Sequence, residues 1–340
     1  MDKNKKIFLV GGGTLGSVSP LLAIAEKYEA DYVFVGSDNG PERALVESYG
    51  LKFVSISSGK LRRYFSGENF KDILKINKAF WQSIKLLRKY KPDIVLTAGS
   101  FVAVPLVWAA KVLRIPSVVH QQDIQVGLAN KLMAPFAKKI TVVFEQQKKD
   151  FNLKKVVVTG NPVRKQRVHS QDEKPVVLIT GGGLGARKLN DFVAHFVPML
   201  SREYEVHHIL GTKNWEQKFE HENYFTYKFI KEGMIDLMAR ADIIISRAGM
   251  GFISEAASLK KALVLIPIPH SHQERNSAFF AKQNAAYMVR QESFQIMDRY
   301  LQKLIRHKEL RTGAGENLHN LFPRHAVDNY IKLIKEIAKK

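Results

Sequence analysis

The 340-residue chain contains no cysteine. This absence excludes disulfides, thiol nucleophiles and cysteine-ligated metal sites, and it is compatible with a reducing compartment. Long apolar runs are missing too, because no stretch approaches the roughly 18 consecutive apolar residues of a membrane span. The apolar segment near the start, KKIFLVGGG, is too short for a signal peptide. We therefore expect a soluble or peripheral protein.

Acidic residues are scarce relative to basic ones. There are 53 Lys and Arg against 32 Asp and Glu, which gives a formal net charge of +21. A field of this sign favours a polyanionic partner such as nucleic acid, anionic lipid or a phosphorylated substrate. A lysine-rich composition of the source organism is the alternative. No recognised nucleic-acid-binding module accompanies the charge, so we expect no nucleic-acid partner.

Short β-branched segments alternate with helical patterns along the chain. In the first half, strands are predicted at KKIFLV, DYVFV, KFVSI, DIVLT, PSVVH and ITVVF, with helices at residues 20–28, 41–49 and 70–90. The pattern restarts with VVLIT and continues through EVHHIL, DIIIS and LVLIP. Such alternation predicts parallel sheets with crossover helices. The fold class is therefore α/β, with two Rossmann-like domains.

The domain boundary is predicted within GNPVR, residues 160–164, where Pro162 breaks the regular pattern. We predict an N-terminal domain over residues 1–163 and a C-terminal domain over residues 164–325. A basic amphipathic helix over residues 326–340 is a candidate to pack back on the N-terminal domain.

Two glycine-rich loops follow the first strands of the two halves. GGGTLGS, residues 11–17, has the spacing G-x-G-x-x-G, and Asp38 ends the second strand, as in a dinucleotide fingerprint. GGGLGA, residues 181–186, occupies the equivalent place in the second half. Glycines in such loops let a ligand approach backbone N–H donors at a helix N-terminus. The alternatives are tight turns without ligands or, for the first loop, an NAD-dependent dehydrogenase.

A third turn, SRAGMGF at residues 246–252, also connects a strand to a helix. We expect this helix to begin near Phe252, with N-terminal amides and a dipole that favour a diphosphate. Glu255 then falls on the first helical turn. There it either accepts hydrogen bonds from ribose hydroxyls or caps the helix.

Two polar segments follow predicted strands. In HSHQERN, residues 270–276, Gln273 and Asn276 share one helix face, which suits amides that grip sugar hydroxyls; a solvated helix start is the alternative. His-x-His lacks a third histidine, and Glu274 is the only carboxylate nearby, so we expect no metal site. HQQD, residues 120–123, lies where open α/β sheets bind ligands. The alternative is an ordinary polar loop, which would have a similar composition.

Together these motifs resemble the MurG family, UDP-N-acetylglucosamine–lipid I N-acetylglucosaminyltransferases with the GT-B fold, in which two Rossmann-like domains face each other across a cleft. The matching motifs, in the family's order, are GGGTLGSVSP, SGKLRRYF, TAGSFVAVP, HQQD, GNPVR, GGGLGARKLN, RAGMGFISE and HQERN. The resemblance implies transfer of N-acetylglucosamine from UDP-GlcNAc to lipid I, giving lipid II in peptidoglycan synthesis. The alternatives are a transferase of this fold with another lipid acceptor, such as diacylglycerol, or a UDP-sugar epimerase.

The resemblance also implies a role for individual residues. The donor residues would be Ile230 for uracil, Glu255 for ribose, Met250, Gly251, Phe252 and Arg164 for the diphosphate, and Gln273 for N-acetylglucosamine. The acceptor would lie against the N-terminal domain, at Thr14, Leu15 and Gly16 and at residues 99–105.

Three sites depart from the family's usual motifs. Ser17 replaces a histidine, Gly183 replaces a serine that would donate to phosphate, and Gln121 and Asp123 replace a glutamate and an asparagine. Serine is not a base at neutral pH unaided, so Asp123 is the predicted general base and Ser17 the second candidate catalytic residue. We predict an inverting transfer without metal or cofactor, in which helix N-termini and Arg164 stabilise the leaving diphosphate.

Residues 60–91 carry ten basic side chains against only Glu68 and Asp72. Phe65, Phe70, Phe80 and Trp81 are interspersed among them. Basic groups with exposed aromatics suit an anionic bilayer, which predicts a peripheral protein at the cytoplasmic face of the membrane. The alternative is a long helix whose aromatics are core and whose lysines are solvated.

Overall fold

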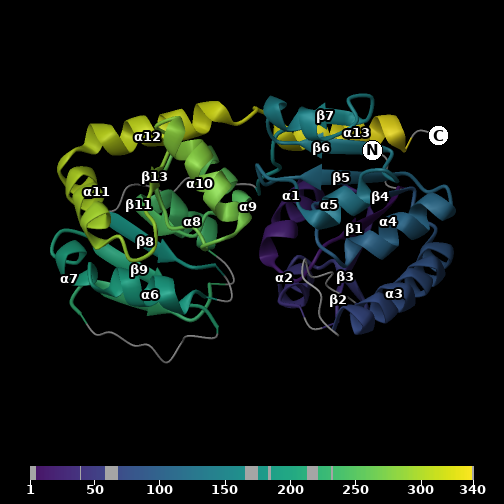
Figure 1. Ribbon diagram of the computed structural model, residues 1–340, viewed down its shortest axis with the longest axis horizontal. Coiled ribbons are helices and arrows are strands. Elements are labelled where there is room, and N and C mark those ends of the chain that lie inside the picture. Colours follow the sequence, from purple (N-terminus) through teal and green to yellow (C-terminus); the bar gives the residue numbers. More distant parts are fainter. Residues whose placement is uncertain are drawn as a thin grey trace. The chain divides into compact units, whose positions relative to one another are not determined.

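The computed structural model describes residues 5–38, 40–57, 68–164, 175–182, 185–212, 221–230 and 233–338. The chain forms two compact units, coloured along the sequence in Figure 1. The first consists of Met1–Gln122, Val126–Lys165 and Pro323–Lys340, and the second of Asp123–Gln125 and Gln166–Phe322.

The first unit is built on a seven-stranded parallel sheet in the order β3-β2-β1-β4-β5-β6-β7. Its strands are β1 (Lys6–Val10), β2 (Asp31–Ser37), β3 (Lys52–Ile56), β4 (Ile94–Thr97), β5 (Ser117–Gln121), β6 (Lys139–Val142) and β7 (Val156–Val158). Its helices are η1 (Leu15–Ser17), α1 (Ser19–Lys27), α2 (Glu42–Ser48), α3 (Glu68–Tyr90), α4 (Ala103–Val112), α5 (Leu128–Met133), η2 (Glu145–Asp150) and α13 (Ala326–Ile337).

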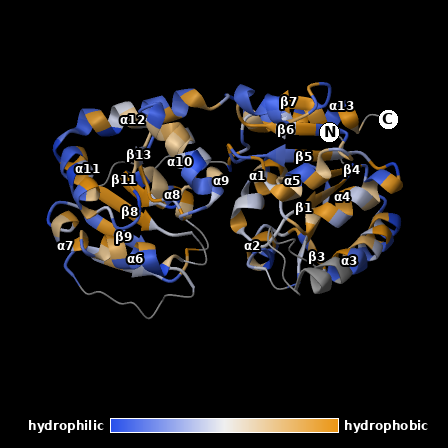
Figure 2. Cartoon of the chain, viewed as in Figure 1, coloured by the Kyte–Doolittle hydropathy of each residue, from blue (hydrophilic) through white to orange (hydrophobic). Residues whose placement is uncertain are grey.

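Helices cover both faces of this sheet, so β1 is apolar and buried at every position after Lys6. Phe8 and Val10 join a core with α3 and α4, whereas Ile7 and Leu9 face the opposite core. That second core includes residues of α1 and of the C-terminal helix α13, among them Tyr330, which is fully buried. Strands buried on both faces need continuous hydrophobic runs, and this is the pattern that the sequence carries (Figure 2).

The second unit has a six-stranded parallel sheet in the order β10-β9-β8-β11-β12-β13. Its strands are β8 (Val176–Thr180), β9 (Glu205–Ile209), β10 (Tyr224–Tyr227), β11 (Ala241–Ser246), β12 (Ala262–Leu265) and β13 (Tyr287–Met288). Its helices are α6 (Arg187–Ala194), α7 (Val197–Leu200), α8 (Met234–Arg240), α9 (Met250–Ser258), α10 (His272–Lys282), α11 (Phe294–Arg306) and α12 (Lys308–Leu321).

The two parallel sheets confirm the predicted α/β class with two Rossmann-like units. In each sheet the strand order reverses once, between β1 and β4 in the first unit and between β8 and β11 in the second. Ligands of open α/β sheets bind outside the carboxyl ends of the strands at such a reversal. Within the described ranges, no helix is both long and apolar enough to cross a membrane.

Candidate functional site

The reversal point of the second sheet is flanked by two turns that follow β8 and β11. In the turn after β8, Gly182 and Gly185 adopt left-handed φ angles of 92° and 79°. A Cβ at Gly181 would lie 2.6 Å from Ala186 Cβ, so the chain cannot turn here with a larger residue. Gly183, the predicted phosphate-side glycine, lies outside the described residues. The two turns leave backbone groups at the place where a ligand of this fold would bind.

Helix α9 begins immediately after the β11 turn. Gly249 is its N-cap, and Ile253 N–H donates to Gly249 O at 3.1 Å. The amides of Met250, Gly251 and Phe252 precede this bond, so they have no acceptor within the helix. A Cβ at Gly249 would meet no heavy atom within 4 Å, which leaves the helix start open to an approaching group. The helix N-terminus can therefore present amides and a dipole to an anion.

Glu255 lies one turn further along α9 than the sequence predicted. The helix starts at Met250 rather than near Phe252, because Gly249 already supplies the extended N-cap conformation. Glu255 is thus the sixth helical residue, and its placement on the first turn was wrong. Capping boxes use the third helical residue, so the capping alternative is excluded. The side chain is buried, with 6% of its surface exposed.

Arg247, for which the sequence predicted no individual role, forms hydrogen bonds with the segments that follow β12 and β13. Its Nη1 donates to the carbonyls of Ile266 (3.0 Å) and Pro267 (3.1 Å), and its Nη2 donates to Gln291 Oε1 (2.9 Å). Burial lowers the pKa of Arg247 to about 10, so the guanidinium stays charged at neutral pH. No carboxylate takes part in these three bonds, and the positive charge therefore remains available to the β11 turn beside it.

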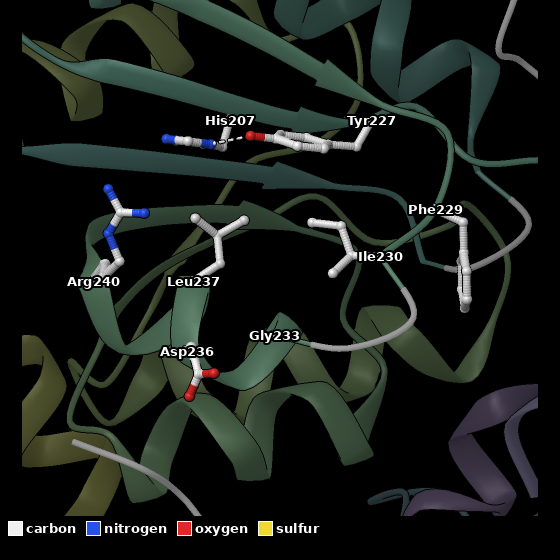
Figure 3. Close-up of a pocket in the computed structure, with 8 residues that line it drawn as sticks. All are labelled: His207, Tyr227, Phe229, Ile230, Gly233, Asp236, Leu237 and Arg240. Atoms are coloured by element: carbon white, nitrogen blue, oxygen red, sulfur yellow. Dashed lines mark hydrogen bonds between the residues drawn. The ribbon is translucent and has the colours of Figure 1, made fainter. Parts of the chain in front are cut away.

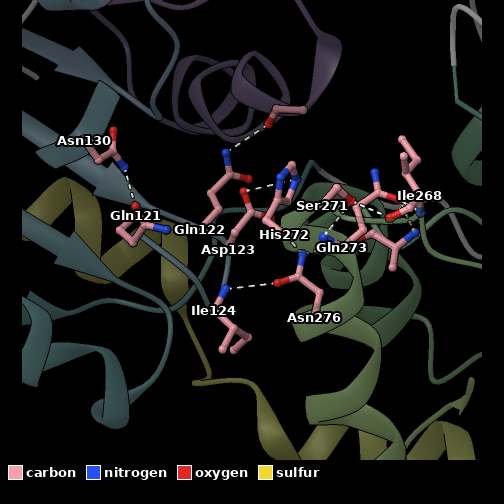
Figure 4. Close-up of polar contacts among 12 residues, drawn as sticks. Gln121, Gln122, Asp123, Ile124, Asn130, Ile268, Ser271, His272, Gln273 and Asn276 are labelled. Atoms are coloured by element: carbon pink, nitrogen blue, oxygen red, sulfur yellow. Dashed lines mark hydrogen bonds and ion pairs between the residues drawn. The ribbon is translucent and has the colours of Figure 1, made fainter. Parts of the chain in front are cut away.

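Polar side chains of α10 form hydrogen bonds with the same turn (Gln273 and Asn276 in Figure 4). Gln273 Oε1 accepts hydrogen bonds from Ala248 N and Ile268 N, both at 3.2 Å. Asn276 is fully buried; its Oδ1 accepts from Ile124 N at 3.0 Å, and its Nδ2 donates to Ala248 O at 3.0 Å. Because these contacts occupy the Asn276 amide, they favour a supporting role for this residue over direct contact with a sugar.

Asp123 is held by residues of α10. Its Oδ1 accepts from Asn276 Nδ2 at 2.8 Å, and its Oδ2 lies 3.8 Å from His272 Nε2. The side chains of Asp123 and His272 are 32% and 49% exposed, so both reach solvent. A carboxylate that is fixed through one oxygen and accessible at the other can accept a proton from a bound hydroxyl.

In the first unit, Ser17 closes the glycine-rich loop on itself. Its hydroxyl accepts from Gly12 N at 3.2 Å and donates to Thr14 O at 3.3 Å. The side chain is buried, whereas Thr14 and Gly16 are exposed and Leu15 is half-buried. Ser17 therefore shapes the loop, and the exposed rim beside it is the part that can meet a ligand.

The loop after β4 is joined to this glycine-rich loop. Ser100 adopts a left-handed φ of 89°, unfavourable for a residue with a Cβ, and its hydroxyl donates to Gly12 O at 2.8 Å. Gln122, after β5, donates to Gly16 O at 3.0 Å and to Ala98 O at 3.2 Å. Segments that follow three strands thus meet at the reversal point of the first sheet.

Two further predicted residues lie in separate surroundings. Arg164 belongs to the first unit, where its Nη1 donates to Tyr49 Oη at 3.5 Å. Ile230, in the second unit, lines a cavity of about 440 Å³ together with Phe229, Tyr227 and His207 (Figure 3). His207 Nδ1 lies 2.8 Å from Tyr227 Oη at one end of this cavity. Its volume lies within the range of small-molecule sites.

Both halves of the chain match family descriptions. Residues 7–142 match the glycosyltransferase family 28 N-terminal domain, and residues 176–327 match the family 28 C-terminal domain. A protein of Clostridium botulinum (strain 657 / Type Ba4) is 36% identical over 355 residues, with 99% of each chain covered. One of Clostridium kluyveri is 38% identical over 309 residues, covering 85% of this chain and 87% of its own. Both are named UDP-N-acetylglucosamine–N-acetylmuramyl-(pentapeptide) pyrophosphoryl-undecaprenol N-acetylglucosamine transferase.

Solved structures share the fold. The crystal structure of Acinetobacter baumannii MurG has a TM-score of 0.73 at 24% identity, covering 98% of this chain and 99% of its own. A UDP-GlcNAc 2-epimerase from Neisseria meningitidis, bound to UDP-GlcNAc, has a TM-score of 0.72 at 15% identity, covering 97% and 100%.

Proposed function

The chain belongs to the MurG family within glycosyltransferase family 28, and from this membership we propose that it transfers N-acetylglucosamine from UDP-N-acetylglucosamine to lipid I. The product would be lipid II, the precursor used in peptidoglycan synthesis. The observation that carries the proposal is the similarity to named transferases along nearly the whole chain.

The donor is proposed to bind at the reversal point of the second sheet. Its diphosphate would meet the amides of Met250, Gly251 and Phe252, and its ribose hydroxyls would donate to Glu255. The open N-terminus of α9 and the buried carboxylate one turn later support this placement. Uracil would occupy the cavity lined by Ile230, whose backbone can pair with the base edge. Arg164 and Gln273 would contact the diphosphate and the transferred sugar.

In the proposed reaction, a hydroxyl of the acceptor sugar attacks the anomeric carbon of the donor with inversion. The bond from that carbon to the diphosphate oxygen breaks, and UDP leaves with the bonding electrons. Asp123 accepts the proton of the attacking hydroxyl. The α9 amides stabilise the charge that develops on the diphosphate, and the cationic Arg247 adds to that field. The exposed Thr14, the half-buried Leu15 and the exposed Gly16 would contact the acceptor.

We further propose that the first unit contacts an anionic membrane surface through one face of α3. Lys78, Trp81, Lys85 and Arg88 follow each other at helical spacing and are exposed, with 61% of Trp81 accessible. Phe80 differs, because it packs against the core beneath α3. The predicted Phe65, and the side chains of residues 68–74, fall outside what the structure describes. An exposed indole among cations suits the membrane interface, at about 1 kcal/mol per well-placed basic residue.

Sedimentation with vesicles tests this surface. Wild type should bind vesicles that contain anionic lipid more tightly than neutral vesicles, and Lys85→Glu combined with Trp81→Ala should lose most of that preference. Lys303→Glu on α11, an exposed charge change in the second unit, is the matched control. Equal binding of wild type to both kinds of vesicle would contradict the electrostatic contact.

The transferase proposal is tested by UDP release from UDP-N-acetylglucosamine in EDTA, with and without a lipid I analogue. Release that depends on the analogue is expected. Epimerised nucleotide sugar or free 2-epimerised hexosamine without acceptor would point instead to an epimerase. UDP binding without turnover on lipid I, but with turnover on diacylglycerol, would show that the acceptor is misassigned.

A further inference from the structure

Glu42 places a fully buried carboxylate inside the first glycine-rich loop. Its Oε1 accepts from the Ser37 backbone N–H at 2.7 Å and from the Ser37 hydroxyl at 2.6 Å. Its Oε2 accepts from Gly13 N–H at 3.1 Å. All three bonds come from uncharged donors, as in loops that hold a bound anion.

Glycines on two segments make room for this carboxylate. A Cβ at Gly12 or at Gly40 would collide with the Glu42 carboxyl group. A Cβ at Gly36, on β2, would lie 2.5 Å from the Phe53 ring and 3.1 Å from Glu42 Cγ. Gly12 and Gly40, which are not among the three glycines of the fingerprint spacing, therefore make room for an internal side chain, which enters the loop from the first turn of α2.

The amides of Gly11 and Gly12 are also used internally. Gly11 N–H donates to Val35 O at 3.2 Å, and Gly12 N–H donates to the Ser17 hydroxyl. Gly13 N–H, the third, is the one bound to Glu42. A phosphate at these amides would have to displace the carboxylate or lie beside it, and two anions in contact repel each other strongly where water is excluded.

The structure assigns Glu42 to the place that a nucleotide phosphate takes in dinucleotide-binding folds: it is the resident anion of this loop. It acts as a positioning residue, because it fixes Gly13 and so sets the direction of the exposed rim at residues 14–16. It also keeps phosphate groups off the Gly13 amide, while the amides of Gly11 and Gly12 are already bonded within the unit. The positioning role for the acceptor rests on the function proposed above, whereas the anion role does not.

The anion role can be tested without any activity measurement, by removing the Glu42 side chain and adding a small carboxylate from solution that can take its place. Glu42→Ala should melt at lower temperature than wild type, and sodium formate should raise its melting temperature by several degrees more than sodium chloride of equal ionic strength. Wild type and Glu47→Gln should respond alike to the two salts. Glu47 is the matched control, since it lies on the same helix, is exposed and pairs with Arg43 at 3.3 Å. An equal response of Glu42→Ala to both salts would overturn the anion role.

Kinetics test the positioning role. In Glu42→Gln, an amide NH₂ would face the Gly13 N–H, so the loop should shift while the helix remains in place. We expect kcat/KM for the lipid I analogue to fall about 10-fold or more with KM for UDP-N-acetylglucosamine unchanged. Glu42→Ala should lose more, and formate should restore part of it. Equal effects on donor and acceptor parameters would overturn the positioning role. Should Glu42→Ala fail to fold, Glu42→Ser, which also removes the carboxylate and leaves space for a free one, replaces it in the melting experiment, with the same expected response to formate.

Discussion

His120 makes the stability of the first unit depend on pH in a way that can be calculated. The imidazole is buried on β5, with Nδ1 2.9 Å from Thr141 Oγ1 and Nε2 2.8 Å from Asn161 Oδ1. Tyr330 of α13 lies against it, with the ring centroids 5.8 Å apart. Burial lowers the pKa of His120 from 6.5 to about 4, because the charged form loses hydration that these neutral partners do not replace.

The folded pKa lies below the unfolded one, so the unfolded chain binds more protons in the interval between them. The stability that neutral His120 contributes is complete above pH 6.5 and is lost as the pH falls toward 4. For these two values, the free energy of unfolding should fall by about 2 kcal/mol between pH 7 and pH 5 because of this residue alone. The full loss, well below pH 4, would be about 3 kcal/mol.

Hydrogen exchange of β5 and β6 peptides, corrected for the intrinsic rate, measures this loss within the first unit. The restriction matters because His208 of the second unit is also buried, with its pKa lowered to about 3. Wild type should lose about 2 kcal/mol more between pH 7 and pH 5 than His120→Gln does. His325→Asn is the control, since His325 is exposed and has a left-handed φ of 58° that asparagine tolerates. Equal losses in wild type and His120→Gln would refute the reasoning.

Three predictions concern the second unit. Asp123→Asn keeps the oxygen that accepts from Asn276, so kcat should fall about 100-fold or more with donor KM unchanged; near-normal turnover would contradict the base assignment. Glu255→Gln should weaken UDP binding about 10-fold in calorimetry, and unchanged affinity would remove the ribose contact. Asn276→Ala leaves several buried groups without their partner and should cost about 3 kcal/mol in urea unfolding; a loss under about 1 kcal/mol would show that the contacts matter little.

The sequence by itself determined most of the strands and their parallel arrangement, although β7, β10 and β13 were not predicted. A strand covered by helices on both faces needs a nearly continuous apolar run, and KIFLV and VVLIT carry that signal locally. The positions of the glycine turns were equally local, since each lies between a strand and a helix. The motifs also sufficed to identify the family, because they occur in the family's order along the chain.

The tertiary structure decided what each polar group of those motifs contacts. In the sequence, Glu42 is indistinguishable from any acidic residue at the start of a helix. Its carboxylate reaches the Gly13 and Ser37 amides only because α2 packs beside the end of β2. Asn276 reads as a sugar-binding amide, yet it holds Ile124 and Asp123, which lie some 150 residues earlier in the chain. Apolar periodicity reports burial along one segment, whereas a hydrogen bond needs a partner within about 3 Å. Only the packing of distant segments brings such partners together.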